Sequence, residues 1–290
     1  MGRRRLHPLA GLKARPKPEG DMAKAGPRQA PVALITGASA GIGEALARCF
    51  ARSGHRLVLV ARRAVRLRAL AASLGNEFGV PAVALPADLS RPQAAAALAT
   101  ALRRRRLTVD VLVNNAGVLE AGLFARMPAR SHRQMIDLNV SALSAVLAQF
   151  VPGMVRRGRG RILNVASIAA FQPVPTLATY AATKAFVLSL SESLAEELRD
   201  SGVTVTALCP GLTATPMLNR ATKAHARLAR LPAALVGDVE AVAAEGYRAC
   251  MAGEVIVVPG ALNLAATTAT QAAPRWLVRR VAGALGRRLL

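Results

Sequence analysis

The chain has 290 residues, of which 52% are hydrophobic, so it can bury a large core as one α/β domain or two small ones. It has no run of roughly 18 apolar residues and no apolar N-terminal signal segment, so we expect a cytoplasmic protein. Its three cysteines and four histidines are scattered, so we expect neither a disulfide framework nor a metal site. The net charge of +23 is spread along the chain, but only 3% of residues are aromatic, so we predict no nucleic-acid partner.

The first 30 residues are basic, rich in Pro and Gly and without periodicity, and we expect residues 1–30 to form a disordered arm. From Pro31 onward, short apolar runs alternate with longer helical patterns. The runs predict strands near residues 32–36, 56–61, 81–86, 109–114, 161–166, 202–208 and 254–258. This alternation predicts one doubly wound, Rossmann-like α/β domain over residues 31–260, with a seven-stranded, mostly parallel sheet covered by helices on both faces. A C-terminal extension follows over residues 261–290. Ligands of such sheets bind at the carboxyl ends of the strands, so functional residues are expected there.

A glycine-rich turn, TGASAGIG at residues 36–43, ends the first predicted strand and begins a helix that runs to about Ser53. Gly37 allows a sharp turn, Gly41 allows the backbone to approach a phosphate, and Gly43 allows the helix to pack closely on the strand. The spacing is G-x-x-x-G-x-G and differs from the G-x-G-x-x-G of the common dinucleotide-binding motif. For this motif alone, an ordinary strand-to-helix turn is therefore the alternative.

Two arginines, Arg62 and Arg63, follow the second predicted strand, and no carboxylate lies nearby. An acidic residue at this place binds the ribose 2′-hydroxyl of NAD, whereas arginine accommodates the 2′-phosphate of NADP. We therefore predict NADP(H) as the cofactor, with Arg62 as the stronger candidate. The alternative, exposed charges at the start of the next helix, is disfavoured because cations are unfavourable at a helix N-terminus.

Tyr180 and Lys184 stand four residues apart in an Ala-rich helical segment, so their side chains share one face, a turn apart. They belong to an ordered set of motifs. Besides the glycine-rich turn, the set contains Asp88 in PADLS, NNAG at 114–117, Asn139 in IDLNV, Ser167 in NVASIAA and PGLTAT at 210–215. This set resembles the short-chain dehydrogenase/reductase family over residues 31–260, and no motif departs from the family pattern.

The resemblance implies a catalytic set of Asn139, Ser167, Tyr180 and Lys184. Tyr180 would exchange a proton with the carbonyl or alcohol oxygen, Ser167 would hydrogen-bond that oxygen, and Lys184 would bind the nicotinamide ribose. Asn139 would hold a water that links Lys184 to solvent. The structural alternative is that Asn139 hydrogen-bonds its own backbone at a helix irregularity, and this is compatible with the water-holding role. Lowering a phenol pKa from about 10 to about 7 takes about 4 kcal/mol. A lysine charge at about 4 Å, with an effective dielectric constant of about 20, supplies a similar amount, and the charge of the oxidised nicotinamide supports it, so a lowered Tyr180 pKa is expected.

The resemblance also implies the residues that bind the cofactor. Gly37, Ser39, Gly41, Ile42 and Gly43 belong to the glycine-rich turn, and Arg62 and Arg63 follow the second strand. Asp88 and Leu89 would contact the adenine, and Asn115, Ala116 and Gly117 the adenosine side and the central backbone. Tyr180 and Lys184 also belong to the set, and Pro210, Gly211, Thr213 and Thr215 would contact the carboxamide and the pyrophosphate. An ordinary turn is the alternative for Pro210 and Gly211 taken alone.

The segment after Thr215 is expected to cover the active site. An apolar pocket, and hence an apolar carbonyl or secondary alcohol, is predicted from Leu119, Phe124, Phe171, Val174, Met217 and Leu218. Four cations of the expected lid are interpreted as a solvated helix face in preference to an anion-binding site: Arg220, Lys223, Arg227 and Arg230.

Residues 274–290 predict a basic amphipathic helix. Its apolar face holds Leu277, Val278, Val281, Ala284, Leu285 and Leu289, and Arg275, Arg279, Arg280 and Arg287 lie opposite, with Arg288 as an exception. Weak contact with an anionic membrane surface and packing on the protein or a sister subunit are both compatible with this pattern.

The leading prediction is an NADP(H)-dependent oxidoreductase that interconverts a carbonyl and a secondary alcohol on an apolar small molecule. We expect a homodimer or homotetramer, assembled through helices around residues 125–155 and 177–200. The alternative is a non-catalytic NADP(H)-binding regulatory or interaction protein with the same fold, but such a protein has no need of the four catalytic residues together.

Overall fold

The computed structural model describes residues 30–224 and 236–289 of the chain. The expected N-terminal arm, apart from Ala30, and two of the expected lid cations, Arg227 and Arg230, lie outside these residues.

A seven-stranded sheet forms the centre of the molecule. Its strands are β1 (Val32–Thr36), β2 (Arg56–Ala61), β3 (Ala82–Pro86), β4 (Val111–Asn114), β5 (Gly160–Val165), β6 (Val203–Leu208) and β7 (Ile256–Val257). All neighbouring pairs are parallel, in the order β3-β2-β1-β4-β5-β6-β7. The predicted doubly wound fold is therefore confirmed. The strand order reverses between β1 and β4, which is the place where such sheets bind ligands.

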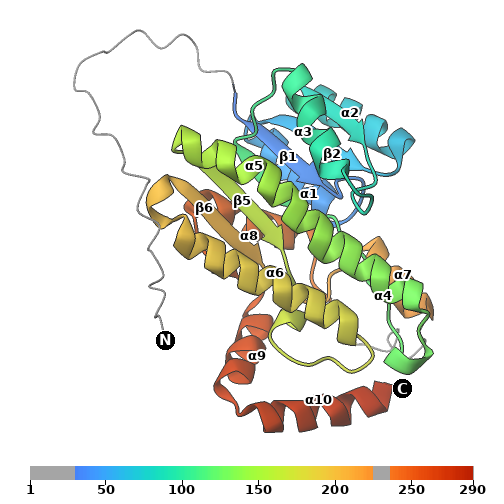
Figure 1. Ribbon diagram of the computed structural model, residues 1–290. Coiled ribbons are helices and arrows are strands. Elements are labelled where there is room, and N and C mark those ends of the chain that lie inside the picture. The colour runs from blue at the N-terminus through green and yellow to red at the C-terminus, as the bar shows by residue number, and fades with distance from the viewer. Residues whose placement is uncertain (1–29, 225–235, 290) are drawn as a thin grey trace, which may run out of the picture.

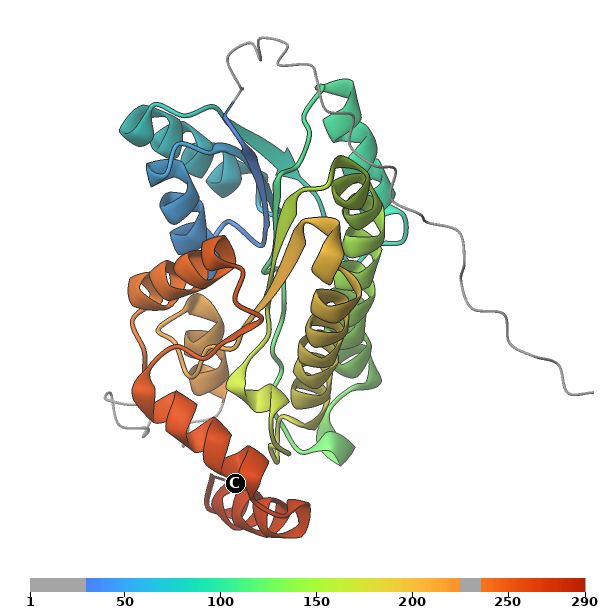
Figure 2. The ribbon, with the colours of Figure 1, turned by 90° about the vertical axis from the view of Figure 1, so that its left-hand side faces the viewer.

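Helices cover both faces of the sheet (Figures 1 and 2). One face packs against α1 (Ile42–Arg52), α2 (Ala64–Phe78) and α8 (Val239–Ala252), and the other against α3 (Ala94–Arg104), α5 (Leu143–Arg157) and α6 (Ala178–Glu197). A hydrophobic core lies on each face of the sheet, and the strands contribute side chains to both cores because successive side chains point to opposite faces. In β1, for example, Leu34 lies in the core under α3, α5 and α6, and Ile35 lies in the core under α1, α2 and α8.

One long helical stretch runs from α4 (Ala129–Ile136) through a π-helical turn, η2 (Asp137–Ala142), into α5. Among the described residues, this stretch of 29 residues is the one helix long and apolar enough to cross a membrane. A single such helix is weak evidence for a span. Its inward side belongs to the core, where Leu138, Val146 and Leu147 are buried.

The remaining helices lie near the carboxyl end of the sheet or beyond it, except the short turn at Arg199–Ser201, which precedes β6 and lies at the amino end. They are α7 (Pro216–Ala224), α9 (Ala261–Ala272), α10 (Arg275–Leu289) and the short 3-10 turns η1 (Phe124–Arg126), η3 (Ile168–Ala170) and η4 (Arg199–Ser201). The predicted C-terminal helix corresponds to α10, whereas α9 was not predicted. Figures 1 and 2 show α9 and α10 together at one end of the molecule, with α10 projecting past the sheet.

Candidate active site

The glycine-rich turn joins β1 to α1 and packs against the loop after β4. Gly37 and Gly41 have positive φ angles of 67° and 59°. A Cβ on Gly37 would lie 2.8 Å from the Cα of Ala116, and a Cβ on Gly43 would lie 2.5 Å from the carbonyl oxygen of Gly37. The turn therefore leaves no room for side chains at these two positions, and Gly41 forms the N-terminal cap of α1.

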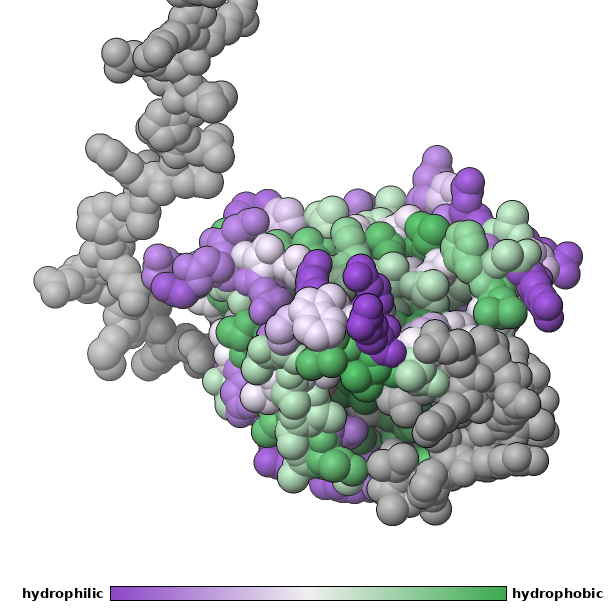
Figure 3. Space-filling model, turned by 90° about the horizontal axis from the view of Figure 1, so that it is seen from below, coloured by the Kyte–Doolittle hydropathy of each residue, from purple (hydrophilic) through white to green (hydrophobic). Residues whose placement is uncertain are grey.

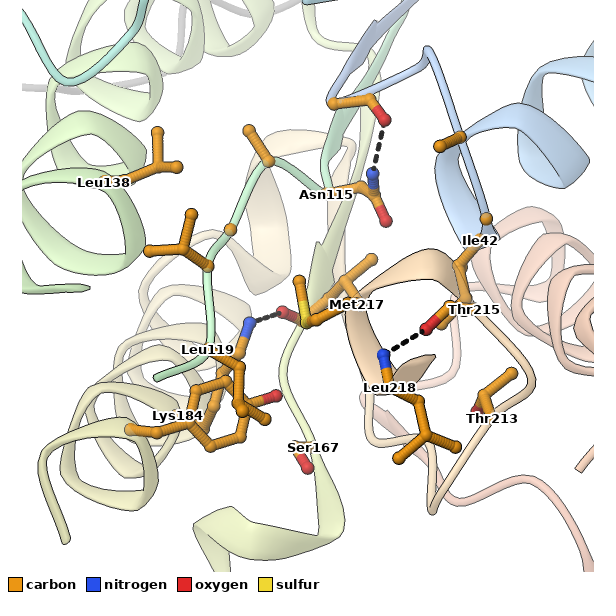
Figure 4. A pocket seen from close by; sticks show the side chains of 18 of the residues that line it. Ile42, Asn115, Leu119, Leu138, Ser167, Lys184, Thr213, Thr215, Met217 and Leu218 are labelled. Atoms are coloured by element: carbon orange, nitrogen blue, oxygen red, sulfur yellow. Dashed lines mark hydrogen bonds between the residues drawn. The ribbon is translucent and has the colours of Figure 1, made fainter. Parts of the chain in front are cut away.

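Asn115 holds this turn in place. Its Nδ2 donates to the carbonyl oxygens of Thr36 and Gly37 at 3.0 and 3.2 Å, and Figure 4 draws one of these two bonds. The Thr36 hydroxyl oxygen in turn accepts from the backbone N–H groups of Asn115 and Ala116. The side chain of Asn115 thus fastens two strand ends to each other.

A cavity of about 600 Å³ opens at the carboxyl ends of the strands. All of the predicted catalytic and cofactor-binding residues line it except Gly43 and Asn139. They come from the segments that follow β1, β2, β3, β4, β5 and β6 and from helix α6. The fold thus brings together residues that are far apart in the sequence. The size suits a cofactor together with a small substrate.

Arg62 and Arg63 lie exposed at one end of the cavity. The Nη2 of Arg63 lies 3.3 Å from the hydroxyl of Ser39 in the glycine-rich turn, and Arg63 also stands at the N-cap of α2. A cation therefore does stand at a helix N-terminus here, although we expected this to be disfavoured. Arg62 lies near Asp88, whose carboxyl pKa is lowered mainly by hydrogen bonds from Ser90 and further by the charge of Arg62.

Ser167, Tyr180 and Lys184 meet in the interior of the cavity, and all three are buried. Ser167 follows the end of β5, where its hydroxyl oxygen accepts from the backbone N–H of Ala169. Lys184 donates from Nζ to the carbonyl oxygen of Val165 at 2.8 Å (Figure 4), and this Nζ lies 5.8 Å from the centre of the Tyr180 ring. The one-turn spacing on α6 therefore places both functional groups in the same cavity.

The electrostatics of this group differ from the prediction. Burial raises the pKa of Tyr180 to about 12, and a hydrogen bond with the side chain of Ser167 opposes that rise. Burial also lowers the pKa of Lys184 to about 8. The expected lowering of the phenol pKa was wrong, because it counted the lysine charge at about 4 Å and left out the desolvation of a fully buried phenol. At neutral pH the phenol keeps its proton, as a proton donor must.

Asn139 lies in the π-helical turn η2 and does not line the cavity. Only 1% of it is exposed. Its Oδ1 accepts from the N–H of Val118 at 2.9 Å, and its Nδ2 donates to the carbonyl oxygen of Val118 and to the hydroxyl of Thr183. The side chain thus braces the loop after β4 against α6, and it does not bond its own backbone. The predicted water-holding role stays a prediction.

The substrate side of the cavity is apolar, as four of the six predicted residues line it: Leu119, Val174, Met217 and Leu218. Two were wrongly placed. Phe124 is 64% exposed and lies outside the cavity, and Phe171 packs against the core under α5 and α6. Both stand in loops whose side-chain direction has no periodic pattern in the sequence.

The cavity also contains polar residues that sequence reasoning missed, among them Glu120, Gln134 and Gln172. The Oε1 of Gln172 accepts from the hydroxyl of Thr270 in α9 at 3.2 Å. No motif marked these residues, although Gln172 follows Ser167 closely. Arg220 of the expected lid lines the cavity, and the side chain of Lys223 lies outside the described residues.

Comparisons with known proteins place the chain in a family. The family model described as short chain dehydrogenase matches residues 31–226. Nodulation protein G of Rhizobium sp. (strain N33) is 34% identical over 240 residues, which are 80% of this chain and 96% of that protein. The chain therefore belongs to the short-chain dehydrogenase/reductase family of oxidoreductases.

Solved structures agree with this assignment. A short-chain dehydrogenase from Sphingobium yanoikuyae in complex with NADPH is 38% identical, with a TM-score of 0.72 over 84% of this chain and 97% of that one. The bulky-bulky ketone specific alcohol dehydrogenase from Comamonas testosteroni is 33% identical, with a TM-score of 0.70 over 85% and 96%. A Burkholderia phymatum family member in complex with NAD is 26% identical, with a TM-score of 0.74 over 83% and 92%. A nicotinamide dinucleotide is thus the cofactor class, and both NADPH and NAD occur among the similar structures.

Proposed function

We propose that this protein is an NADP(H)-dependent oxidoreductase that interconverts a carbonyl and a secondary alcohol on an apolar small molecule. The observation that supports this most directly is the convergence of Ser167, Tyr180 and Lys184 inside one cavity that also contains the glycine-rich turn. A non-catalytic binding protein would not need a buried phenol and a buried amine in the same cavity.

The residues of the cavity fit a dinucleotide phosphate. The glycine-rich turn lets the backbone and the N-terminus of α1 approach a diphosphate, because Gly37 and Gly41 carry no side chain. Arg62 and Arg63 offer two cations, with no carboxylate beside them on the chain, to a ribose 2′-phosphate. When bound, NADP(H) would supply or accept the hydride. The complex of the Sphingobium relative with NADPH supports the same choice.

In the reductive direction, the residues of the chain would polarise and protonate the substrate oxygen. The hydroxyl of Ser167 would donate a hydrogen bond to the carbonyl oxygen, and the phenol of Tyr180 would give that oxygen its proton. Lys184 would stabilise the resulting phenolate while its amine is protonated, which holds below its pKa of about 8. Oxidation of the alcohol would run through the same groups in reverse.

The substrate would be apolar next to its carbonyl. Leu119, Val174, Met217 and Leu218 line that side of the cavity, and the polar side chains of Glu120, Gln134 and Gln172 lie among its other lining residues. The ketone specificity named for the Comamonas relative supports a bulky ketone as the first class to test.

The test uses the two tyrosines of the chain as a matched pair. Tyr180→Phe should bind NADPH as the wild type does and lose turnover of every ketone in a panel. Tyr247→Phe should keep both, because Tyr247 packs against Phe50 in the core under α1, α2 and α8. NADPH binding is read by fluorescence titration and turnover by NADPH oxidation. Full turnover by Tyr180→Phe would refute the assigned role.

The cofactor choice has a separate test. The double substitution Arg62→Gln and Arg63→Gln should weaken NADPH binding by roughly tenfold or more and leave NADH binding unchanged, since charge-assisted contacts to a phosphate are each worth about 1.5–3 kcal/mol. Tighter binding of NADH than of NADPH by the wild type would overturn the NADP(H) proposal.

A homodimer or homotetramer is proposed through the outward face of α4, η2 and α6. Phe124, Ile136 and Phe186 are exposed there. A second hollow of about 400 Å³ on this face is lined by Phe124, Ile136, Val140, Ala178, Thr179, Ala182 and Thr183. Ile136→Glu should therefore lower the mass measured by light scattering, and an unchanged mass would argue against this face.

A further inference from the structure

Helix α9 turns its polar side toward the protein and its apolar side outward. Asn263, Thr267 and Thr270, spaced at i, i+4 and i+7, are its least exposed residues, and Thr267 is buried. Leu262 and Leu264 are 64% and 52% exposed. A helix on the surface of a domain normally does the opposite and buries its apolar stripe. No residue of α9 is charged, and its outer face holds Leu262, Leu264 and several alanines beside the exposed Thr268 and Gln271.

Helix α10 continues this surface and adds cations. Leu277, Val281 and Ala284 are exposed and share one face through their i, i+4 and i+7 spacing. Trp276 is 54% exposed, and the guanidinium of Arg280 lies 5.8 Å from its ring centre. Such a mixture of aromatic, aliphatic and arginine side chains is typical of helices that lie in the plane of a membrane surface.

We call α9 and α10 together the C-terminal arm. Its charge is of one sign, because the sequence has five arginines and no acidic residue after Glu254. Figure 3, which views the molecule from the end where the arm lies, shows hydrophobic and strongly hydrophilic side chains interspersed over that face. Of the exposed large hydrophobic side chains among the described residues, the arm holds Leu262, Leu264, Trp276, Leu277 and Val281.

The charge of the arm decides between the surfaces that could cover it. In a symmetric contact between two arms, two arginine-rich helices would approach each other without a carboxylate between them. An anionic bilayer offers both a hydrocarbon boundary for the exposed apolar side chains and phosphate groups for the arginines. We propose that the C-terminal arm docks the protein on an anionic phospholipid surface.

The arm is also joined to the wall of the cavity. Thr270 of α9 hydrogen-bonds Gln172, which lines the cavity, and Asn263 lies so close to Gly211 that a Cβ there would be 2.6 Å from its amide. Docking of the arm would therefore hold this wall near the bilayer. The value of that placement for an apolar substrate rests on the proposed function, whereas docking itself does not.

Trp276 provides a direct test, because it is the only tryptophan of the chain. The full-length protein is mixed with vesicles of phosphatidylcholine alone, or of phosphatidylcholine with about one third phosphatidylglycerol. With the anionic vesicles, tryptophan emission should shift to the blue and be quenched by brominated acyl chains, and the neutral vesicles should cause neither change. Raising the salt concentration should reverse the binding.

Matched variants separate docking from general attraction of a basic protein. Arg279→Gln with Arg280→Gln should weaken binding to anionic vesicles by roughly tenfold or more, since a juxtamembrane cation contributes about fivefold. Arg103→Gln with Arg104→Gln removes two exposed cations from the end of α3 and should have a much smaller effect. NADPH binding by each variant reports that the protein is folded.

Two results would overturn the proposal. The first is vesicle binding without any change in Trp276 emission, or equal losses in the two arginine variants, because another basic segment would then make the contact. The second is a blue shift that grows with protein concentration in the absence of vesicles. That result would show that a second copy of the chain covers the arm.

Discussion

Replacing Gly43 by alanine should destabilise the protein, although the same change elsewhere in a helix usually stabilises it. Alanine is favoured over glycine in a helix by about 1 kcal/mol. At Gly43, however, a Cβ would stand 2.5 Å from the carbonyl oxygen of Gly37 and even closer to Nδ2 of Asn115. Relief of this overlap would cost about 1–3 kcal/mol. It would also break the two hydrogen bonds from Asn115, each worth about 1 kcal/mol. The net loss should be about 2–4 kcal/mol.

Gly75 offers the matched control, since it lies within α2 and a Cβ there would meet only the carbonyl oxygen of Val80 at an ordinary 3.5 Å. Thermal unfolding followed by circular dichroism should therefore give a melting temperature several degrees lower for Gly43→Ala and slightly higher for Gly75→Ala. Fluorescence titration should show weaker NADPH binding for Gly43→Ala alone, because the glycine-rich turn would move. A melting temperature of Gly43→Ala equal to or above that of the wild type would refute the packing argument.

Three further predictions concern pH and the cavity wall. Turnover in the reductive direction should fall as pH rises through about 8, because Lys184 then loses its charge, and a pH profile of kcat that stays flat to pH 10 would contradict this. Thr270→Val should raise KM for a ketone by about fivefold through loss of the bond to Gln172, with the Kd of NADPH unchanged. The exposed Thr268→Val is its control, and equal KM values in the two variants would count against the bond. Burial lowers the pKa of His55, so the unfolded chain takes up a proton more readily and stability should decrease as pH falls below about 6.5. His55→Gln should show a shallower decrease in melting temperature between pH 8 and 5, whereas curves of the same shape would exclude His55 as the cause.

The sheet and the position of the cavity could be predicted from the sequence because their causes are local. Apolar runs of strand length alternate with helical patterns, and this alternation permits few arrangements other than a parallel sheet covered on both faces. The one-turn spacing of Tyr180 and Lys184 and the glycine-rich turn are likewise local patterns. Together with the motifs that follow the other strands, they indicate which residues line a common cavity.

Other features depend on contacts between distant parts of the chain. The side chain of Asn115 binds the carbonyl oxygens of Thr36 and Gly37, and that of Asn139 binds Val118 and Thr183, and neither set of contacts was predicted. A short motif indicates that an amide is present and contains no information about which distant backbone group it will meet.

Burial and exposure were also decided only by the tertiary structure. The pKa of Tyr180 rises because the fold removes the phenol from water, an effect that outweighs the hydrogen bond with the side chain of Ser167. The amphipathic pattern of residues 274–290 was visible in the sequence, but the inverted packing of α9 was not. Helical periodicity specifies which residues share a face of a helix, and only the packed protein determines whether that face points toward the core or away from it.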